Sequence, residues 1–361
     1  MVEAADLRVY PDLHPDAFTH DEDRAALAVL RDVPGLDRLL KAISGSTIER
    51  AVFANLRHSA IRIGPRQYPS IYRMVERSCR VLDVPVPETW LIGGYTVNAS
   101  AFGFQSYTIR LYQGLVDLME PEELQAVIAH EVGHIACEHM LYKSLGALLG
   151  EMGGAVMGRL LGPPAELLSG ALELAMLRWS RAAEYSCDRA ALLVVDDAEV
   201  VARTLARLGG SSLRYRDELS LEAALAQDAR YSADNSQLDQ ALLGLAQLGD
   251  THPEPILRAH AIMDWSRSAA FAELRAGRYP TRSSVRERLL RPQIEGMDTC
   301  RACGALVPTT RNRCPSCDCH RSAEVQVRCA CGAVNDRRWR SCRACGAQLA
   351  HLLGPPEGSS S

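Results

Sequence analysis

Two histidines four residues apart, with a glutamate directly after the first, form the part of this chain best suited to do chemistry. The stretch AVIAHEVGHIACEH covers residues 126–139. On a helix, His130 and His134 fall on one face, one turn apart, and their imidazoles can bind one zinc ion. Glu131 would point about 100° away, which suits a general base that takes a proton from an activated water. The spacing therefore predicts a hydrolytic zinc site that lacks a third ligand.

A second polar segment could complete this site. In SRAAEYSCDRAAL, residues 180–192, Glu184 and Asp188 are four residues apart and share a helix face. Glu184 can supply the third ligand, and Asp188 can hold the outer nitrogen of a ligand histidine, His130 in particular, in the correct tautomer. The alternative is a solvated acidic face paired with nearby arginines. It fits less well because the flanking alanines and leucines indicate a largely buried helix.

The helix that carries the two histidines is expected to span residues 121–142. Pro121 suits its first position, and acidic residues follow in its first turn. Gly133 lowers helix propensity, so its presence indicates close approach by another element. His139 would lie on the same helix but away from the face of the two histidines. We therefore expect His139 to form structural hydrogen bonds rather than to bind the metal.

The composition along the chain predicts an α+β, mostly helical fold. Residues 1–90 are expected to be mostly helical, and residues 89–112 are rich in Thr, Val, Ile, Tyr and Phe, which predicts a small sheet of two or three strands. Pro163-Pro164 precedes a second helix that should end near Val195. Ala- and Leu-rich helical sequence then continues to about residue 295.

The four best-defined motifs resemble those of the HtpX-like gluzincin peptidases, family forty-eight of the metallopeptidases, which includes the CAAX prenyl endopeptidases and the mitochondrial Oma-type protease. The motifs, within about residues 30–265, are TVNASAFG at 96–103, HEVGH at 130–134, SRAAEYSCD at 180–188 and THPEPILR at 251–258. The resemblance implies a gluzincin peptidase domain with a small antiparallel sheet over the HExxH helix. Membrane-embedded members have clear N-terminal transmembrane helices. This chain lacks them, so an integral-membrane role is not carried over.

The resemblance also implies roles outside the two helices. TVNASAFG would be an edge strand that pairs with an extended peptide, so that Asn98 and Ala99 bind substrate; a plain hairpin strand without a ligand is the alternative. His252 and Arg258 match a His-Pro followed six residues after the His by an Arg, which in the family reaches back over the zinc. His252 would either donate to the oxyanion of the tetrahedral intermediate or occupy the open position of zinc and keep the enzyme latent. Arg258 would contact the ligands rather than the metal.

A glycine ridge marks the most apolar part of the chain. It consists of Gly146, Gly150, Gly154, Gly158 and Gly162. On a helix this spacing permits close helix–helix approach. A transmembrane hairpin over residues 145–178 is one interpretation, but Glu151 and Arg159 would each cost about 3 kcal/mol at a bilayer centre. We favour packing against the protein's own core or self-association, with a peripheral membrane contact as the alternative.

Eight of the twelve cysteines form two similar groups near the C-terminus. Each group has two close pairs separated by ten residues, which is typical of a zinc ribbon with four thiolate ligands. Cys319 and His320 could substitute for Cys317 in the first group. Metal should supply most of the folding free energy of such small modules. The predicted ligands are Cys300, Cys303, Cys314 and Cys317 in the first ribbon, and Cys329, Cys331, Cys342 and Cys345 in the second.

These patterns predict a peptidase domain over residues 1–295, a double zinc ribbon over 299–347 and a disordered tail over 348–361. The formal net charge of −4 makes no general case for nucleic-acid binding. Residues 299–351 hold nine arginines and three acids, but eight thiolates and two zinc ions would together add about −4. We therefore expect the ribbons to recruit protein rather than nucleic acid. No secretory signal is evident, so a cytoplasmic location is expected, with membrane association as the alternative.

The sequence as a whole predicts a zinc-dependent endopeptidase that acts on peptide or protein substrates, with a role in protein quality control as a further expectation. It would hold one catalytic and two structural zinc ions. Glu131 would act as general base and then as general acid toward the leaving amine. The alternative is a catalytically silent, zinc-stabilised adaptor that binds protein or nucleic acid through its ribbons. It fits less well because an adaptor has no need of Glu131.

Overall fold

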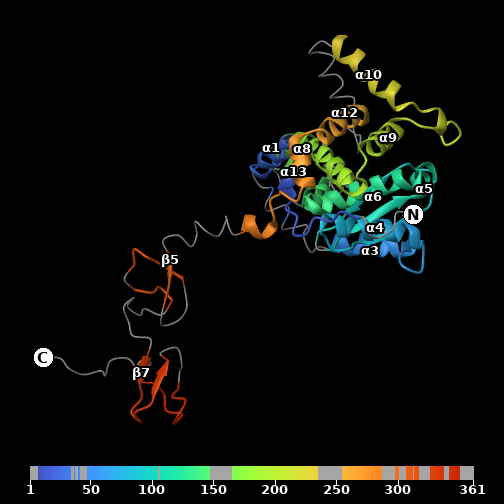
Figure 1. Ribbon diagram of the computed structural model, residues 1–361. Helices are drawn as coiled ribbons and strands as arrows, with labels where there is room; N and C mark the ends of the chain where they lie inside the picture. Colours follow the sequence, from blue (N-terminus) through green and yellow to red (C-terminus); the bar gives the residue numbers. More distant parts are fainter. Residues whose placement is uncertain are drawn as a thin grey trace. The chain divides into compact units, whose positions relative to one another are not determined.

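The computed structural model divides the chain into two compact units, residues 1–281 and 282–361 (Figure 1). The structure describes residues 7–33, 36, 40, 47–104, 106–146, 165–234, 254–286, 297–300, 306–311, 313–316, 326–336 and 341–349. The helices of the first unit are η1 (Pro15–Ala17), α1 (Asp21–Arg31), α3 (Thr47–Ser59), α4 (Pro69–Leu82), α5 (Gln113–Leu118), α6 (Pro121–Ala136), α8 (Ala165–Val195), α9 (Ala198–Gly209), η2 (Arg216–Glu218), α10 (Leu221–Asp234), α12 (Pro255–Ser266) and α13 (Ala269–Arg275). The fold is α+β and mostly helical, as predicted.

A four-stranded sheet with the order β1-β2-β4-β3 lies in the first unit. Its strands are β1 (Ala60–Ile63), β2 (Glu88–Ile92), β3 (Ala99–Phe102) and β4 (Thr108–Tyr112). The expected strands of residues 89–112 are present, but the sheet is mixed rather than antiparallel, because β2 and β4 pair in parallel. The chain runs from β2 to β3 at the far edge and returns as β4 between them, which sets β2 and β4 in the same direction. β1 was not predicted.

The helix α6 begins as the sequence predicts and ends earlier. Pro121 is at its start, and Glu120 and Glu123 form a capping box. The helix ends at Ala136 rather than at residue 142, because Glu138 adopts a left-handed backbone conformation with φ of 59°. A new helical segment then covers residues 140–146. Because of this break, His139 lies in a turn after α6, whereas the sequence predicted it to lie on the helix itself.

The core is built around α6, which packs against α8 on one side and against the sheet at β3. α6 contacts α4, α8, α9 and β3, and its residues from Glu123 to Ala136 are all buried. Gly133 is the point of closest approach: a Cβ added there would lie 2.8 Å from the Cβ of Ala190 and 3.2 Å from the Cα of Cys187. This confirms the close approach that Gly133 predicted, and it brings the motif residues of the two helices together.

The second unit contains two small two-stranded sheets, described here by themselves. β5 (Met297–Thr299) pairs with β6 (Leu306–Pro308), and β7 (Gln326–Arg328) pairs with β8 (Val334–Asp336), both antiparallel. Each is accompanied by a small buried cluster that contains cysteines. Among the described residues of this unit, these clusters are too small to form an ordinary hydrophobic core.

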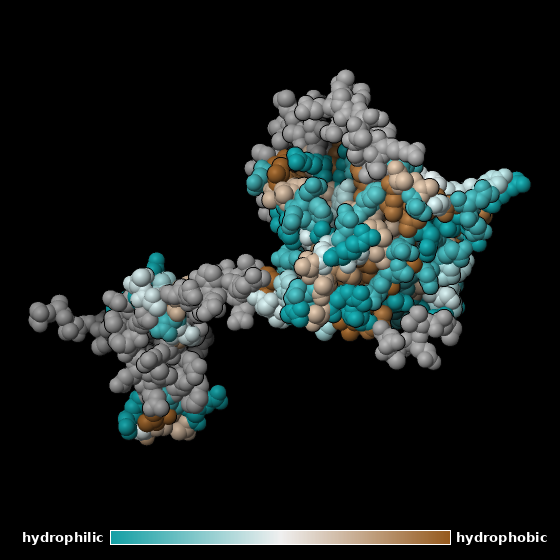
Figure 2. All heavy atoms as spheres, turned by 45° about the horizontal axis from the view of Figure 1, so that its top comes forward, coloured by the Kyte–Doolittle hydropathy of each residue, from teal (hydrophilic) through white to brown (hydrophobic). Residues whose placement is uncertain are grey.

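The surface of the first unit seen in Figure 2 is mostly hydrophilic, with hydrophobic side chains scattered among polar ones. Among the helices that the structure describes, none is long and apolar enough to cross a membrane. The predicted hairpin of residues 145–178 lies mostly outside the described residues, because residues 147–164 are not among them. Its packing, self-association or membrane contact remains a prediction. α8 starts directly after Pro164 and ends at Val195, as predicted.

Candidate metal centre and active-site pocket

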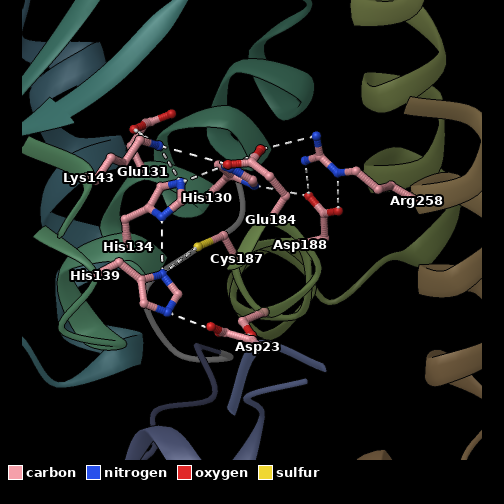
Figure 3. A network of polar contacts seen from close by, with 11 residues as sticks. Asp23, His130, Glu131, His134, His139, Lys143, Glu184, Cys187, Asp188 and Arg258 are labelled. Atoms are coloured by element: carbon pink, nitrogen blue, oxygen red, sulfur yellow. Dashed lines mark hydrogen bonds and ion pairs between the residues drawn. The ribbon is translucent and has the colours of Figure 1, made fainter. Parts of the chain in front are cut away.

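Three potential metal ligands converge between α6 and α8 (Figure 3). His130 Nε2 lies 3.2 Å from Glu184 Oε2, and His134 Nε2 lies 3.2 Å from Glu184 Oε1. All three side chains are buried. Ligand atoms around a tetrahedral zinc ion with bonds of 2.0–2.1 Å stand about 3.3 Å apart, so this group fits one such ion. The structure thus brings together His130, His134 and Glu184, the three residues that the sequence motifs predicted as metal ligands.

Asp188 and Arg258 contact the potential ligands His130 and Glu184. His130 Nδ1 lies 3.0 Å from Asp188 Oδ1. Arg258 donates two hydrogen bonds to Asp188, at 2.7 and 2.8 Å, and its Nη1 lies 3.1 Å from Glu184 Oε2. Burial alone would raise the pKa of Asp188, but Arg258 and His130 outweigh burial and hold that pKa below its usual value. An ionised Asp188 only accepts hydrogen bonds, so it turns the His130 Nδ1–H toward itself and leaves Nε2 facing Glu184.

The two histidines have opposite electrostatic surroundings. Burial alone would lower the pKa of His130, but the carboxylates of Glu184 and Asp188 outweigh burial and raise the pKa to about 9. For His134, burial and the ammonium of Lys143 lower the pKa well below its usual value. The carboxylates therefore attract positive charge to the centre of the group. The low pKa of His134 favours the neutral imidazole, which is the form that binds metals.

Glu131 lies beside the three potential ligands. Its Oε2 atom is buried and has no hydrogen-bond partner among the described residues. Lys143 Nζ lies 4.0 Å from this oxygen, 3.9 Å from Glu184 Oε1 and 2.5 Å from His134 Nε2. A buried carboxylate oxygen without a hydrogen-bond donor is costly unless a ligand or water satisfies it. The arrangement therefore favours a proton acceptor that faces the same space as the two histidines.

Lys143 was not predicted from the sequence. It lies on the helical segment that follows the break at Glu138. Two features of the sequence could have identified it. It is the one residue with a full charge between Glu138 and Glu151, and the chain has only one other lysine among 40 Lys and Arg residues.

Cys187 offers an alternative third ligand. One ligand atom each from His130, His134 and Cys187 lie within 4.8 Å of one another. However, the Cys187 Sγ lies 3.8 Å from His139 Nδ1, which faces the Nδ1 side of His134. Burial also raises the pKa of the Cys187 thiol, which disfavours the thiolate that a metal needs. Glu184, by contrast, faces the Nε2 atoms of both histidines.

His139 contacts the ligand His134 and a distant helix. Its Nδ1 lies 3.2 Å from His134 Nδ1, and its Nε2 lies 3.0 Å from Asp23 Oδ2 on α1. His139 thus forms hydrogen bonds, as expected, but toward partners that the sequence analysis did not identify. Asp23 is on the buried face of α1 together with Ala26 and Leu30. The carboxylate of Asp23 stands in the apolar stripe of α1, and this unusual position is the sequence feature that could have identified it.

A cavity of about 350 Å³ opens beside His130 and Glu131, and its lining includes Asn98 and Ala99. The Tyr112 N–H donates to the Asn98 carbonyl at 3.1 Å. Backbone groups of successive strand residues alternate in direction, so the N–H and C=O of Ala99 point to the outer edge of the sheet. β3 is an edge strand of the sheet. His252, the other residue expected near the cleft, lies outside the described residues.

The second cysteine group is gathered in the structure. Cys329, Cys331, Cys342 and Cys345 can offer one metal ion four sulfur atoms that lie within 4.8 Å of one another. Two of the Sγ–Sγ distances are 3.6 and 3.7 Å, close to the roughly 3.8 Å expected for tetrahedral zinc with Zn–S bonds of 2.3 Å. Backbone N–H groups lower the pKa of Cys342 to about 6, which favours its thiolate.

The first cysteine group is described only in part. Cys300 and Cys314 are buried together with Val307, whereas Cys303 and Cys317 lie outside the described residues. Cys319 and His320, which could substitute for Cys317, also lie outside them. The ligand set of the first ribbon therefore remains a prediction.

Comparison with known proteins identifies the family to which this chain belongs. The sequence model described as "Peptidase family M48" matches residues 65–266. "Plastoglobule-localized metallopeptidase 48, chloroplastic" from Arabidopsis thaliana is 31% identical over 77% of this chain and 80% of the relative. "Protease HtpX homolog" proteins from Trichormus variabilis and a Nostoc species are 27% and 26% identical over 40% and 48% of this chain, covering 59% and 68% of the relatives. Because the family match covers more than half of the chain and includes the helices that carry His130, His134 and Glu184, this protein belongs to peptidase family M48 and is a metalloprotease.

Proposed function

We propose that this metalloprotease is a zinc-dependent endopeptidase that hydrolyses peptide bonds within protein substrates. One observation carries the proposal: two imidazole Nε2 atoms and a carboxylate converge at distances that fit one zinc ion, next to the buried carboxylate of Glu131. His130, His134 and Glu184 would hold the ion. When bound, zinc lowers the pKa of water and polarises the scissile carbonyl.

Each residue around this site has a chemical task in the proposed reaction. Glu131 takes a proton from the attacking water on its carboxylate and passes it to the nitrogen of the leaving amine. Asp188 accepts from His130 Nδ1 and so keeps the Nε2 lone pair available. Arg258 places one positive charge against the two carboxylates that it contacts, which offsets part of the negative charge of the buried site. His252 would either donate a hydrogen bond to the oxyanion or occupy the open coordination position of zinc and keep the enzyme latent.

Substrate would bind as an extended strand along β3. The outward direction of the Ala99 N–H and C=O supports this role for Ala99, because these groups could pair with a peptide backbone. The carbonyl of Asn98 is already used by Tyr112. We therefore propose that Asn98, which lines the cavity together with Glu131, contributes its side chain to substrate binding. Because residues at an edge strand line the cavity, a substrate polypeptide could extend on both sides of the cleaved bond, as an endopeptidase requires.

The ribbons would carry the two structural zinc ions, one in each cysteine group, and recruit protein substrates. The sulfur distances of the second group support the first part of this proposal. The setting that we propose is cytoplasmic and in contact with membranes or lipid surfaces, with a role in protein quality control. The first relative named above is called plastoglobule-localized, which is in keeping with a lipid-associated setting.

The test is cleavage of casein by the full chain loaded with zinc. Glu131→Gln keeps the size of the side chain and removes the proton acceptor, so turnover should fall at least about a thousandfold with zinc still bound. Glu123→Gln is the matched control. Glu123 is equally buried on the same helix but caps it and contacts Arg203 and Arg207, so this variant should lose stability and keep its turnover. Equal casein cleavage by wild type and Glu131→Gln would rule out the proposed mechanism.

A further inference from the structure

A chain of polar contacts links the proposed metal site to the N-terminal helix α1. His134 uses Nε2 on the metal side and Nδ1 toward His139 Nδ1, at 3.2 Å. The other nitrogen of His139 lies 3.0 Å from Asp23 Oδ2. All three side chains are only about 1% exposed. Water is therefore excluded from this chain of contacts, and each nitrogen must be satisfied by the partner that faces it.

The donors and acceptors of this chain can be assigned from both ends. At one end, an ionised Asp23 only accepts, so His139 must carry its proton on Nε2. A neutral His139 then has a lone pair on Nδ1, and it can only accept from His134 Nδ1–H. At the other end, the Lys143 ammonium only donates, and its Nζ lies 2.5 Å from His134 Nε2. His134 Nε2 must therefore be the acceptor, which again places the proton of His134 on Nδ1. The contacts of Asp23 and those of Lys143 therefore both place the proton of His134 on Nδ1.

That tautomer is the one that a metal requires. A histidine that binds through Nε2 must have its lone pair there and its proton on Nδ1. If His139 instead donated from Nδ1, His134 would carry its proton on Nε2 and could not bind. Asp188 fixes His130 by direct contact. Among the described residues, the Nδ1 of His134 faces His139 rather than a carboxylate, and His139 in turn contacts Asp23.

We propose that Asp23 is a positioning residue that, through His139, fixes the tautomer and orientation of the metal ligand His134. This inference rests on the proposed function of the site. The first unit would then hold its two histidine ligands by two carboxylates: Asp188 acts directly, and Asp23 acts through one intervening imidazole. Asp23 lies outside the segment matched by the family, residues 65–266, so α1 contributes a residue to the site that the matched segment does not contain.

The surroundings of Asp23 hold its carboxylate in place. Ser186 on α8 donates to Asp23 Oδ2 at 2.6 Å, and the His20 N–H donates to the Ser186 hydroxyl at 2.9 Å. Burial alone would raise the pKa of Asp23, but the hydrogen bonds from His139 and Ser186 contribute to holding it below its usual value. Trp179 packs edge-on against the His139 ring, with centroids 5.4 Å apart. These contacts leave His139 little freedom to turn and exchange its two nitrogens.

The first measurement needs no variant. Long-range ¹H–¹⁵N NMR correlations on the full chain with ¹⁵N-labelled histidine report which nitrogen of each neutral imidazole carries the proton. We expect His139 to be protonated on Nε2 and His134 on Nδ1, both with zinc and after chelation. A His139 protonated on Nδ1 would overturn the inference, and it would do so whether or not the site binds zinc.

The second measurement is zinc affinity, by competition with a chelator, in the full chain. Asp23→Asn retains the shape and removes the charge, and we expect its affinity at the catalytic site to fall about 10–100-fold, the usual range for groups that orient a ligand. His139→Phe keeps a ring against Trp179 and should have at least the same effect. Glu123→Gln, a buried carboxylate on α6 that does not contact the histidines, should lose stability without losing zinc affinity.

The outcomes separate the two proposals. If the wild type binds no zinc at the site of His130 and His134, the proposed function fails, and the histidine tautomers still decide the inference. If wild type binds zinc and a folded Asp23→Asn binds it equally well, the inference alone fails. A loss of zinc affinity in Asp23→Asn together with a mixture of His139 tautomers supports it.

Discussion

The proposed metal ligands of the first unit and those of the second are held in place in different ways. His130, His134 and Glu184 are buried on two long helices that pack against a large core. The four cysteines of residues 329–345 lie in turns beside a two-stranded sheet, and Cys331 and Cys345 are exposed. In the first unit, the fold positions the ligands. In the described part of the second, few buried groups accompany the cysteines: Leu349, the half-buried Ala333, and Asn335, which donates to the Cys342 sulfur.

The two proposed metal ions would therefore have different roles in the protein. A ligand set held by helix packing exists before the metal arrives, so the ion can be bound for chemistry and exchanged. A ligand set held by turns depends on the ion, because the described part of the second unit buries too little apolar surface to offset its conformational entropy. The first site would serve catalysis and the second would serve folding.

Removal of metal should show this contrast most strongly. With a mild chelator, the catalytic ion should leave first and the helical content should persist. With a strong chelator, the second unit should lose its structure, because zinc supplies about 10–16 kcal/mol in small zinc modules. The measurement is metal content together with protease sensitivity of residues 282–361. A second unit that keeps its protease resistance without metal would contradict this view of the ribbons.

Replacement of single ligands should sharpen the description of the first site. Glu184→Gln should weaken zinc binding by more than about a hundredfold, a larger loss than groups that only orient a ligand produce. Cys187→Ala should leave the affinity within a few-fold, because the sulfur lies on the Nδ1 side of His134. Zinc competition on the two variants is the measurement. The reverse order of effects would assign the third ligand to Cys187.

The close approach at Gly133 should show how far the helix pair sets the site. Gly133→Ala places a methyl group 2.8 Å from the Cβ of Ala190, so it should lower the free energy of unfolding by about 1–3 kcal/mol. Gly146→Ala is the matched control, since its Cβ would meet only the flexible end of Met176 at 3.2 Å. Urea unfolding of both variants is the measurement. Equal stability of Gly133→Ala and wild type would mean that α6 and α8 can move apart at no cost.

Local patterns predicted the residues that meet between α6 and α8. His130 and His134 are spaced by one helical turn, as are Glu184 and Asp188, and such spacing requires no knowledge of tertiary structure. Pro121, the first-turn acids and Pro163-Pro164 likewise marked helix starts correctly. These features succeed because the interactions that fix them lie within a few residues along the chain.

The features that sequence reasoning missed depend on contacts between distant segments. Asp23 meets His139 across more than a hundred residues, and nothing near Asp23 indicates that partner. The early end of α6 coincides with the left-handed conformation of Glu138, which precedes a histidine held by the distant Asp23. The parallel pairing of β2 and β4 arises because β3 takes the outer place, a choice that strand composition does not encode.

The edge position of β3 has a consequence for which proteins this enzyme could cleave. Backbone groups such as those of Ala99 are the same in every polypeptide, so pairing with them discriminates little between amino-acid sequences. It discriminates strongly between conformations, because a segment already in a helix or a sheet has its own N–H and C=O groups engaged. The protease would therefore select its targets by local unfolding: stable native proteins would be spared next to damaged ones of the same sequence.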